Sequence, residues 1–359
     1  MKNVKLLWKK LKYILIILFV MILIFEIKKK NNNKKPKKVG VIGLRHEVNI
    51  GNNLIKYAIF IKLSEFGFIP YIIGTHLRKH DITFLKKNTN CIIINNSFSE
   101  IKKKDYDILM VNSDQTWRKF DRNYYDYGFL NFSKNWNIPK FIYGASLGYS
   151  NWPFSEKDDK VFKELLKNFT GVSVRENGSI LLINKHLGIK PLFVLDPTLL
   201  INKNYYIELI KSTKIGNLLN INYIFVYIIK KKKIYSNYIE NASRKLNYKI
   251  YKVKMREKNS IEKFIYGIVN SRAVITDSYH GTIFSIIFNK PFISFIRNAK
   301  ERYNSLKYIF NISNRLFETN QIPNFNLLYT PLNLNYTLMN SIKNNSIDYL
   351  KKNLKVVLL

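Results

Sequence analysis

One histidine is well placed by its neighbours for acid–base chemistry. The segment AVITDSYHGTIFSII predicts a strand, a polar turn that contains Ser278, and an apolar helix that begins near Gly281 and Thr282. His280 then lies beside a helix N-terminus, where free N–H groups favour an anion. Because imidazole changes charge near neutral pH, this pattern indicates a general acid or base next to a phosphate or carboxylate. The alternative is a histidine that only caps or packs the turn.

An arginine follows another apolar run in the same way. In GVSVRENGS the strand-like segment ends just before Arg175, and a helix is expected after it. A guanidinium in this position can hold a carboxylate or a phosphate through two parallel hydrogen bonds, and Glu176 is placed to orient it. The alternative is an ordinary surface ion pair.

A third strand end, in DILMVNSDQTW, carries two more candidates. Asp114 can accept a proton from a sugar hydroxyl, and Trp117 can stack on a sugar ring. Equally, Asp114 can cap the following helix and Trp117 can belong to the core.

The loop VIGLRHEVNIGNN leads from an earlier strand into a helix and contains Asn49 and Gly51. It lacks the glycine pattern of dinucleotide-binding folds and the lysine of the P-loop, so its glycines are a weak indication of phosphate binding. A metal site is not expected, because His76 and His80 have no third ligand near them in the sequence.

The candidates all follow apolar runs that alternate with helix-length segments. The expected strands begin at Val39, Tyr71, Cys91, Asp107, Phe141, Gly171, Leu192, Tyr223, Ala273 and Pro291. Such alternation is typical of βαβ units with parallel sheets. We therefore expect an α/β protein with two Rossmann-like, doubly wound domains, residues 39–205 and residues 206–359 with a C-terminal tail, facing each other across a cleft. Ligands of such folds bind at the carboxyl ends of the strands.

The composition excludes several classes of protein. Hydrophobic residues make up 47% and aromatic residues 14%, which is enough for packed cores and excludes disorder for most of the chain. The single cysteine, Cys91, excludes an intrachain disulfide and indicates a reducing compartment. The net charge of +36 comes with an abundance of Lys, Asn, Ile, Tyr and Phe, which indicates AT-rich codons. We therefore expect attraction to small or lipid-bound anions, and no nucleic-acid partner.

An apolar run near the N-terminus predicts a membrane anchor. Tyr13–Phe25 is uninterruptedly apolar and is bordered by lysines on both sides. A helix of this length covers about 20 Å, less than the roughly 30 Å hydrocarbon core, but snorkelling lysines make a tight crossing feasible. A cleaved signal peptide is less well supported, because no small-residue cleavage site follows. Residues 1–38 are thus the expected anchor and basic linker, and the lysines after the run favour a cell-membrane protein with a cytoplasmic body.

Six motifs, in order, resemble those of the polysaccharide pyruvyl transferase family. They are NIGNNLIKYAIFIKLSEFG from Asn49, NSDQTW from Asn112, FIYGASLG from Phe141, SVRE from Ser173, DPTLL from Asp196 and TDSYHGTIFSIIFNKPFI from Thr276. Each motif alone is weak, but six in register over residues 39–295 are specific. The chain departs from the family pattern at Asn52 and Asn53, where many relatives carry an acidic residue, and at Tyr279, where Phe is commoner.

The resemblance implies two Rossmann-like domains in a glycosyltransferase-B-like arrangement. It also implies transfer of pyruvate from phosphoenolpyruvate to a sugar diol of a cell-surface polysaccharide or of its lipid-linked precursor. A cyclic ketal forms and phosphate is released, with no metal and no cofactor besides the co-substrate phosphoenolpyruvate.

This reaction assigns expected roles to the candidates. The catalytic residues are expected to be His280, as the acid that protonates the enol carbon, and Asp114, as the base on the acceptor side. Donor-binding roles are expected for Arg175, Ser278, Gly281 and Thr282. Acceptor-binding roles are expected for Asn49, Gly51 and Trp117.

Three other functions are compatible with the sequence. A nucleotide-sugar glycosyltransferase of the same fold would use the same cleft with a different donor. A non-catalytic, membrane-anchored scaffold for polysaccharide assembly would not need His280. A nucleic-acid-binding protein would show steep salt dependence and would not need Arg175.

Overall fold

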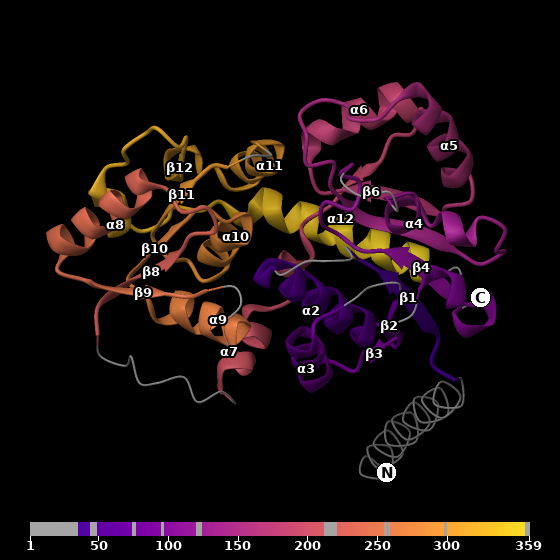
Figure 1. The fold of residues 1–359 in the computed structure, drawn as a ribbon, viewed down its shortest axis with the longest axis horizontal. Helices are drawn as coiled ribbons and strands as arrows, with labels where there is room; N and C mark the ends of the chain where they lie inside the picture. The colour runs from indigo at the N-terminus through magenta and orange to yellow at the C-terminus, as the bar shows by residue number, and fades with distance from the viewer. Residues whose placement is uncertain are drawn as a thin grey trace, which may run out of the picture. The chain divides into compact units, whose positions relative to one another are not determined.

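The computed structural model in Figure 1 describes residues 35–43, 49–73, 77–94, 97–119, 124–211, 221–254, 257, 259–297 and 300–355. Lys38–Leu359 is one compact unit, built around two parallel sheets. The expected anchor, Tyr13–Phe25, lies outside the described residues. Within the described residues, no helix is both long and apolar enough to cross a membrane.

The first sheet has seven parallel strands in the order β3-β2-β1-β4-β5-β6-β7. The strands are β1 Lys38–Ile42, β2 Ile69–Ile73, β3 Ile92–Ile93, β4 Ile108–Val111, β5 Lys140–Ala145, β6 Gly171–Val174 and β7 Leu192–Phe193. Val39 of β1 pairs with Pro70 of β2 on one side and with Ile108 of β4 on the other. The strand order reverses between β1 and β4, so the loops that follow these two strands diverge and leave a crevice between them.

The second sheet has five parallel strands in the order β12-β11-β10-β8-β9. They are β8 Tyr223–Tyr227, β9 Lys249–Lys252, β10 Ala273–Thr276, β11 Phe292–Phe295 and β12 Leu316–Phe317. Here the order reverses between β8 and β10, which pair from Ala273 opposite Ile224 to Thr276 opposite Tyr227. This reversal creates a second crevice. The expected α/β fold with parallel sheets is confirmed.

Helices cover both sheets. The helices after the strands of the first sheet are α2 Ile50–Glu65, α3 Lys79–Asn88, α4 Tyr124–Phe129, α5 Glu156–Leu166 and α6 Asn177–Leu187. The later helices are α7 Lys203–Lys211, α8 Lys233–Leu246, α9 Ser260–Asn270, α10 Tyr279–Ile287, α11 Lys300–Phe310 and α12 Tyr336–Lys355.

The C-terminal helix α12 returns to the first sheet, as Figure 1 shows. The Tyr349 hydroxyl donates to the Ile142 carbonyl of β5 at 2.8 Å, and the Ser346 hydroxyl accepts from the backbone N–H of Leu195 at 3.0 Å. Helix α12 thus stabilises the N-terminal half of the unit, which contains the first sheet.

Both faces of the first sheet are buried, which explains why its strands read as continuous apolar runs. Val41 and Met110 belong to the core cluster that also includes α2 and α12. Ile42 and Val111 point the opposite way, into a cluster with residues of α5 and α6. The first cluster continues into α7, α9 and α10, so one core joins the two halves.

The edge strands β9 and β12 were not among the expected strands. β9 reads KIYK, in which exposed lysines flank the two partly buried residues, and β12 has only two residues. Charged or very short edge strands hinder pairing with other chains, and the same features weaken their sequence signal.

The docking of α12 can be tested with Leu350→Ala. Leu350 is fully buried in the core cluster, so we expect the free energy of unfolding to fall by about 2–5 kcal/mol in urea titrations. The matched control is Leu181→Ala, because Leu181 of α6 is 77% exposed and should change stability by less than about 0.5 kcal/mol. Equal stability of the two variants would contradict the packing of α12 on the first sheet.

Candidate active site

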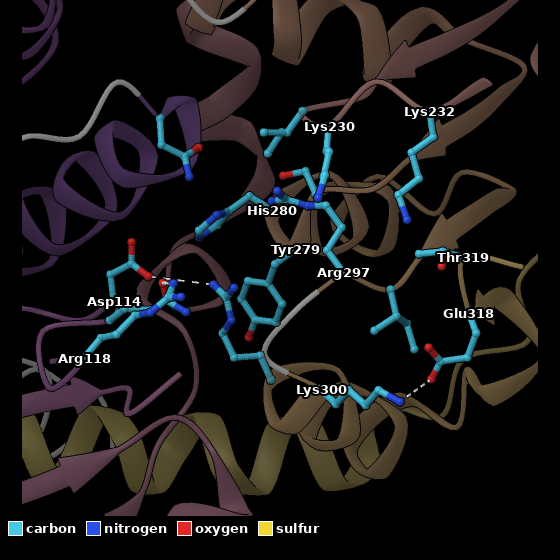
Figure 2. A pocket seen from close by; sticks show the side chains of 16 residues that line it. Asp114, Arg118, Lys230, Lys232, Tyr279, His280, Arg297, Lys300, Glu318 and Thr319 are labelled. Carbon is cyan, nitrogen blue, oxygen red and sulfur yellow. Dashed lines mark hydrogen bonds and ion pairs between the residues drawn. The ribbon is translucent and has the colours of Figure 1, made fainter. Parts of the chain in front are cut away.

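A cavity of about 380 Å³ lies where the carboxyl ends of strands from both sheets meet (Figure 2). It is lined by Asn49 after β1, Asp114 after β4, Lys230 after β8, His280 after β10 and Arg297 after β11. The first four of these strands form the two points where strand order reverses. The cavity therefore occupies the position at which open α/β sheets bind ligands.

Cations dominate the lining of this cavity. They are Arg118, Lys230, Lys232, Arg297, Lys300 and Arg302, against the carboxylates of Asp114 and Glu318. In the view of Figure 2, Asp114 and Arg118 lie to the left of His280, and Lys230 and Lys232 lie to its right. A concave site with this excess of positive charge favours an anionic ligand.

Asp114 sits in a strained turn that directs its carboxylate inward. Its φ is 106°, in the left-handed region that side-chain-bearing residues rarely adopt. The turn is fixed by backbone bonds, because the Asp114 carbonyl accepts from Thr116 N at 2.7 Å and from Ser146 N at 2.9 Å. Such strain at a cavity wall is typical of functional sites.

Arg175 joins three strand ends in the interior. Its Nη1 donates to Asp196 Oδ2 after β7, and its Nη2 donates to Asp114 Oδ1 after β4, both at 2.5 Å. The guanidinium is completely buried and does not line the cavity. The structure therefore places this expected donor-binding residue behind the cavity wall, and we call Arg175, Asp114 and Asp196 the buried charge network.

Glu176 does not orient Arg175 through a hydrogen bond. Its carboxylate accepts from the hydroxyls of Ser146 and Ser179 instead. The two carboxylates that hold Arg175 come from the ends of β4 and β7, which spacing in the sequence could not show.

The charges of this network stabilise one another. Burial is the largest single effect and raises the pKa of both carboxyl groups. The charge of Arg175, together with that of His280 and smaller contributions, outweighs burial and holds the pKa of Asp114 and of Asp196 below the usual range. Burial also acts to lower the pKa of Arg175, and the two carboxylates raise it instead. Asp114, which was expected to be an acceptor-side base, is thus an ionised carboxylate already bound to a guanidinium.

His280 is the second residue of α10 and reaches from the second half of the unit toward the network. Its Nε2 lies 3.7 Å from Asp196 Oδ2, longer than a hydrogen bond, and has no hydrogen-bond partner. On its other side the ring lies against Gly51 of α2, where a Cβ atom would overlap the imidazole. His280 is therefore held between the two halves while it lines the cavity.

The N-terminus of α10 is largely satisfied by its own residues. Ser278 caps it by accepting from Gly281 N at 3.3 Å, and the Thr282 hydroxyl lies 2.7 Å from that of Ser294. Ser278 lines the cavity, but Gly281 and Thr282 do not. Gly281 instead permits close packing, because a Cβ atom there would overlap Thr276.

The expected acceptor-binding residues do not lie together in the structure. Asn49 lines the cavity and caps α2 by accepting from Gly51 N at 3.0 Å. Trp117 is 1% exposed, donates to the Gly128 carbonyl at 2.9 Å and stacks on Phe129. The structure thus places Trp117 in the core and does not bring it to the cavity.

Sequence reasoning missed Asp277, which positions two of the cavity's cations. Its carboxylate accepts from Ile229 N at 2.6 Å and from Lys230 N at 2.9 Å, and its carbonyl accepts from Arg297 Nε at 2.9 Å. Burial raises the pKa of this carboxyl, although the hydrogen bonds oppose that effect. The sequence feature that could have identified Asp277 and Arg297 is their position, because both follow the end of a strand closely.

The buried charge network predicts an inverted pH response in Arg175→Met. In the natural chain the folded-state pKa values of Asp114 and Asp196 lie below the unfolded ones, so their contribution to stability is complete above about pH 4 and is lost at lower pH. In the variant two unpaired buried carboxylates are destabilising by about 3–5 kcal/mol at pH 7 and are relieved by protonation. We expect urea titrations to show the variant gaining stability from pH 7 to pH 5.

The matched control is Arg244→Met, because Arg244 is exposed and donates a hydrogen bond to the neutral side chain of Asn241. It should follow the pH dependence of the natural chain. A parallel pH dependence for Arg175→Met would contradict the network.

The contact between Gly51 and His280 predicts coupling across the two halves. Gly51→Ala forces the imidazole to move and should lower the free energy of unfolding by about 1–3 kcal/mol. In a His280→Ala background the same substitution should cost far less, because the overlapping ring is absent. Additive effects in this double-mutant cycle, measured by urea unfolding, would contradict the contact.

Comparisons with known proteins agree with this architecture. The sequence model of the family described as polysaccharide pyruvyl transferase matches residues 49–298. No protein among those of curated function matches the chain.

Two solved structures with a similar fold are UDP-GlcNAc 2-epimerases. The one from Neisseria meningitidis, bound to UDP-GlcNAc, has a TM-score of 0.54 and 12% identity over 89% of this chain and 99% of its own. The one from Methanocaldococcus jannaschii, in complex with UDP-GlcNAc and UDP, has a TM-score of 0.51 and 14% identity over 89% of this chain and 99% of its own. At such identities the likeness shows the fold alone, that of glycosyltransferase-B-like nucleotide-sugar enzymes.

The family match spans well over half of the sequence, and the chain therefore belongs to the polysaccharide pyruvyl transferase family.

Proposed function

We propose that this protein transfers pyruvate from phosphoenolpyruvate to a sugar diol of a cell-surface polysaccharide or its lipid-linked precursor. The observation that carries the proposal is the cationic cavity at the two strand-order reversals, with His280 in its wall. A donor with one carboxylate and one phosphate matches this charge, and a neutral sugar does not require it.

The reaction needs one proton at the enol carbon and two new bonds from oxygen to carbon. The methylene carbon of phosphoenolpyruvate takes a proton and becomes a methyl group, while the two acceptor hydroxyls form the ketal bonds at the adjacent carbon. The bond from that carbon to the phosphate oxygen breaks. Of the two hydroxyl protons, one balances the proton at the methyl group and the other leaves with phosphate.

His280 is the proposed general acid for this step. It lines the cavity, and the carboxylate of Asp196, 3.7 Å from Nε2, can accept a hydrogen bond from the ring after a small movement. Such a bond fixes the orientation of an imidazole while its other nitrogen serves the substrate. The cations after β8 and β11 can stabilise the charge that develops on the departing phosphate.

His280→Gln should separate binding from turnover. We expect phosphoenolpyruvate to bind with unchanged affinity within a few-fold, and phosphate release in the presence of methyl glycosides with free diols to fall about 10²- to 10⁴-fold. Phosphorus NMR follows both the donor and the product. The matched control is His186→Gln, because His186 stacks on Trp152 and does not line the cavity. Full turnover by His280→Gln would refute the assignment.

A nucleotide-sugar glycosyltransferase is the second candidate function. It is favoured by the likeness of the fold to UDP-GlcNAc 2-epimerases whose structures hold UDP-GlcNAc or UDP. A cationic cavity also suits a diphosphate. Binding of UDP-GlcNAc to the full chain, without binding of phosphoenolpyruvate, would replace the first proposal by this one.

A further inference from the structure

Arg302, in the first turn of α11, is a cavity-lining guanidinium with an unused donor. Its Nε is buried and has no hydrogen-bond partner. Its Nη1 lies 3.9 Å from Asp114 Oδ1, too far for a hydrogen bond, and its guanidinium carbon lies 5.0 Å from the centre of the Tyr279 ring. A buried donor without an acceptor is costly, so this atom points to a missing ligand group.

Other arginines of the region are already engaged. Arg175 donates to two carboxylates behind the wall. Arg297 donates to the Asp277 carbonyl, and Arg118 donates to Gln115 Oε1 at 3.0 Å. Arg302 therefore differs from them in combining a place in the cavity wall with a buried N–H that has no acceptor among the described residues.

Gln115 adds a second unused donor to the lining. Because its Oε1 accepts from Arg118, its amide nitrogen is the remaining polar end. That Nε2 is buried and has no partner among the described residues. Gln115 follows Asp114 directly, and Arg302 Nη1 lies 3.9 Å from the Asp114 carboxylate, so the two unused donors lie beside a carboxylate that is already bound to Arg175.

We infer that Arg302 and Gln115 form a subsite for the carboxylate of the donor. This rests on the proposed function, which supplies a donor with a planar carboxylate and a tetrahedral phosphate. A planar monoanion suits a guanidinium edge and an amide. The dianionic phosphate suits the several cations after β8 and β11, among them Lys230 and Arg297. Arg302 lies beyond residues 49–298, where the family model matches.

The test uses the full chain and two probes, each of which presents one anionic group of the donor. Pyruvate presents the carboxylate without phosphate, and inorganic phosphate presents the other half of the donor. Both are titrated by NMR or calorimetry against the natural chain, Arg302→Gln and Arg302→Lys. The matched control is Arg272→Gln, because Arg272 is exposed at the amino end of β10, the end opposite the cavity.

We expect Arg302→Gln to weaken pyruvate and phosphoenolpyruvate binding about 10- to 100-fold and to leave phosphate binding unchanged within two-fold. Arg302→Lys should recover only part of the loss, because lysine keeps the positive charge but lacks the paired N–H donors of the planar guanidinium. Gln115→Leu should weaken pyruvate binding by a smaller factor, and Arg272→Gln should match the natural chain.

Three results would overturn the inference. The first is unchanged pyruvate binding in Arg302→Gln, and the second is no saturable pyruvate binding by the natural chain. The third is an equal loss of pyruvate and phosphate binding, which would make Arg302 a general source of charge. If pyruvate binds through Arg302 but phosphoenolpyruvate is never consumed, the carboxylate subsite stands and the proposed transfer reaction fails.

Discussion

The ion pairs of Arg175 with Asp114 and Asp196 are the constraint on which the site depends. They tie together the ends of β4, β6 and β7, with Arg175 and Asp196 in the interior and Asp114 at the cavity wall. A buried charge without its partner is strongly destabilising, so none of the three can be replaced alone at little cost. Asp196 also faces His280 across the boundary between the halves, so the network sets the distance at which the imidazole meets the first sheet.

This network also determines where the cavity is positive. Arg175 offsets part of the negative charge of Asp114 and Asp196, and the cations that line the cavity remain available to a ligand. Several come from the second half, where Asp277 fixes the backbone of Lys230 through its buried carboxylate and the guanidinium of Arg297 through its backbone carbonyl. The first half thus contributes a nearly neutral part of the cavity wall, and the second half contributes most of the positive charge.

Much of the fold was predictable from the sequence, because both faces of the central strands are buried and their apolar runs are long enough to read. The rule that ligands bind at the carboxyl ends of strands also directs attention to His280, Asp114 and Asn49, and these three residues line the cavity. The rule gives a position along the chain but no direction for the side chain. Arg175 and Trp117 follow strands as expected, yet both turn into the interior, where Arg175 binds Asp196 and Trp117 donates to the Gly128 carbonyl.

For the same reason, the family resemblance gives less information about the ligand than about the fold that surrounds it. Asp114, Arg175 and Asp196 each belong to a motif that carries the resemblance, and together they form the buried network. Arg302 belongs to none of these motifs, because the cavity wall tolerates a charge in several places, whereas the buried network tolerates its three charges only together. A motif selected by such an all-or-none constraint is easy to recognise in a sequence. A cation that needs only to reach a ligand can come from any nearby loop or helix, and it is found only once the chain is folded.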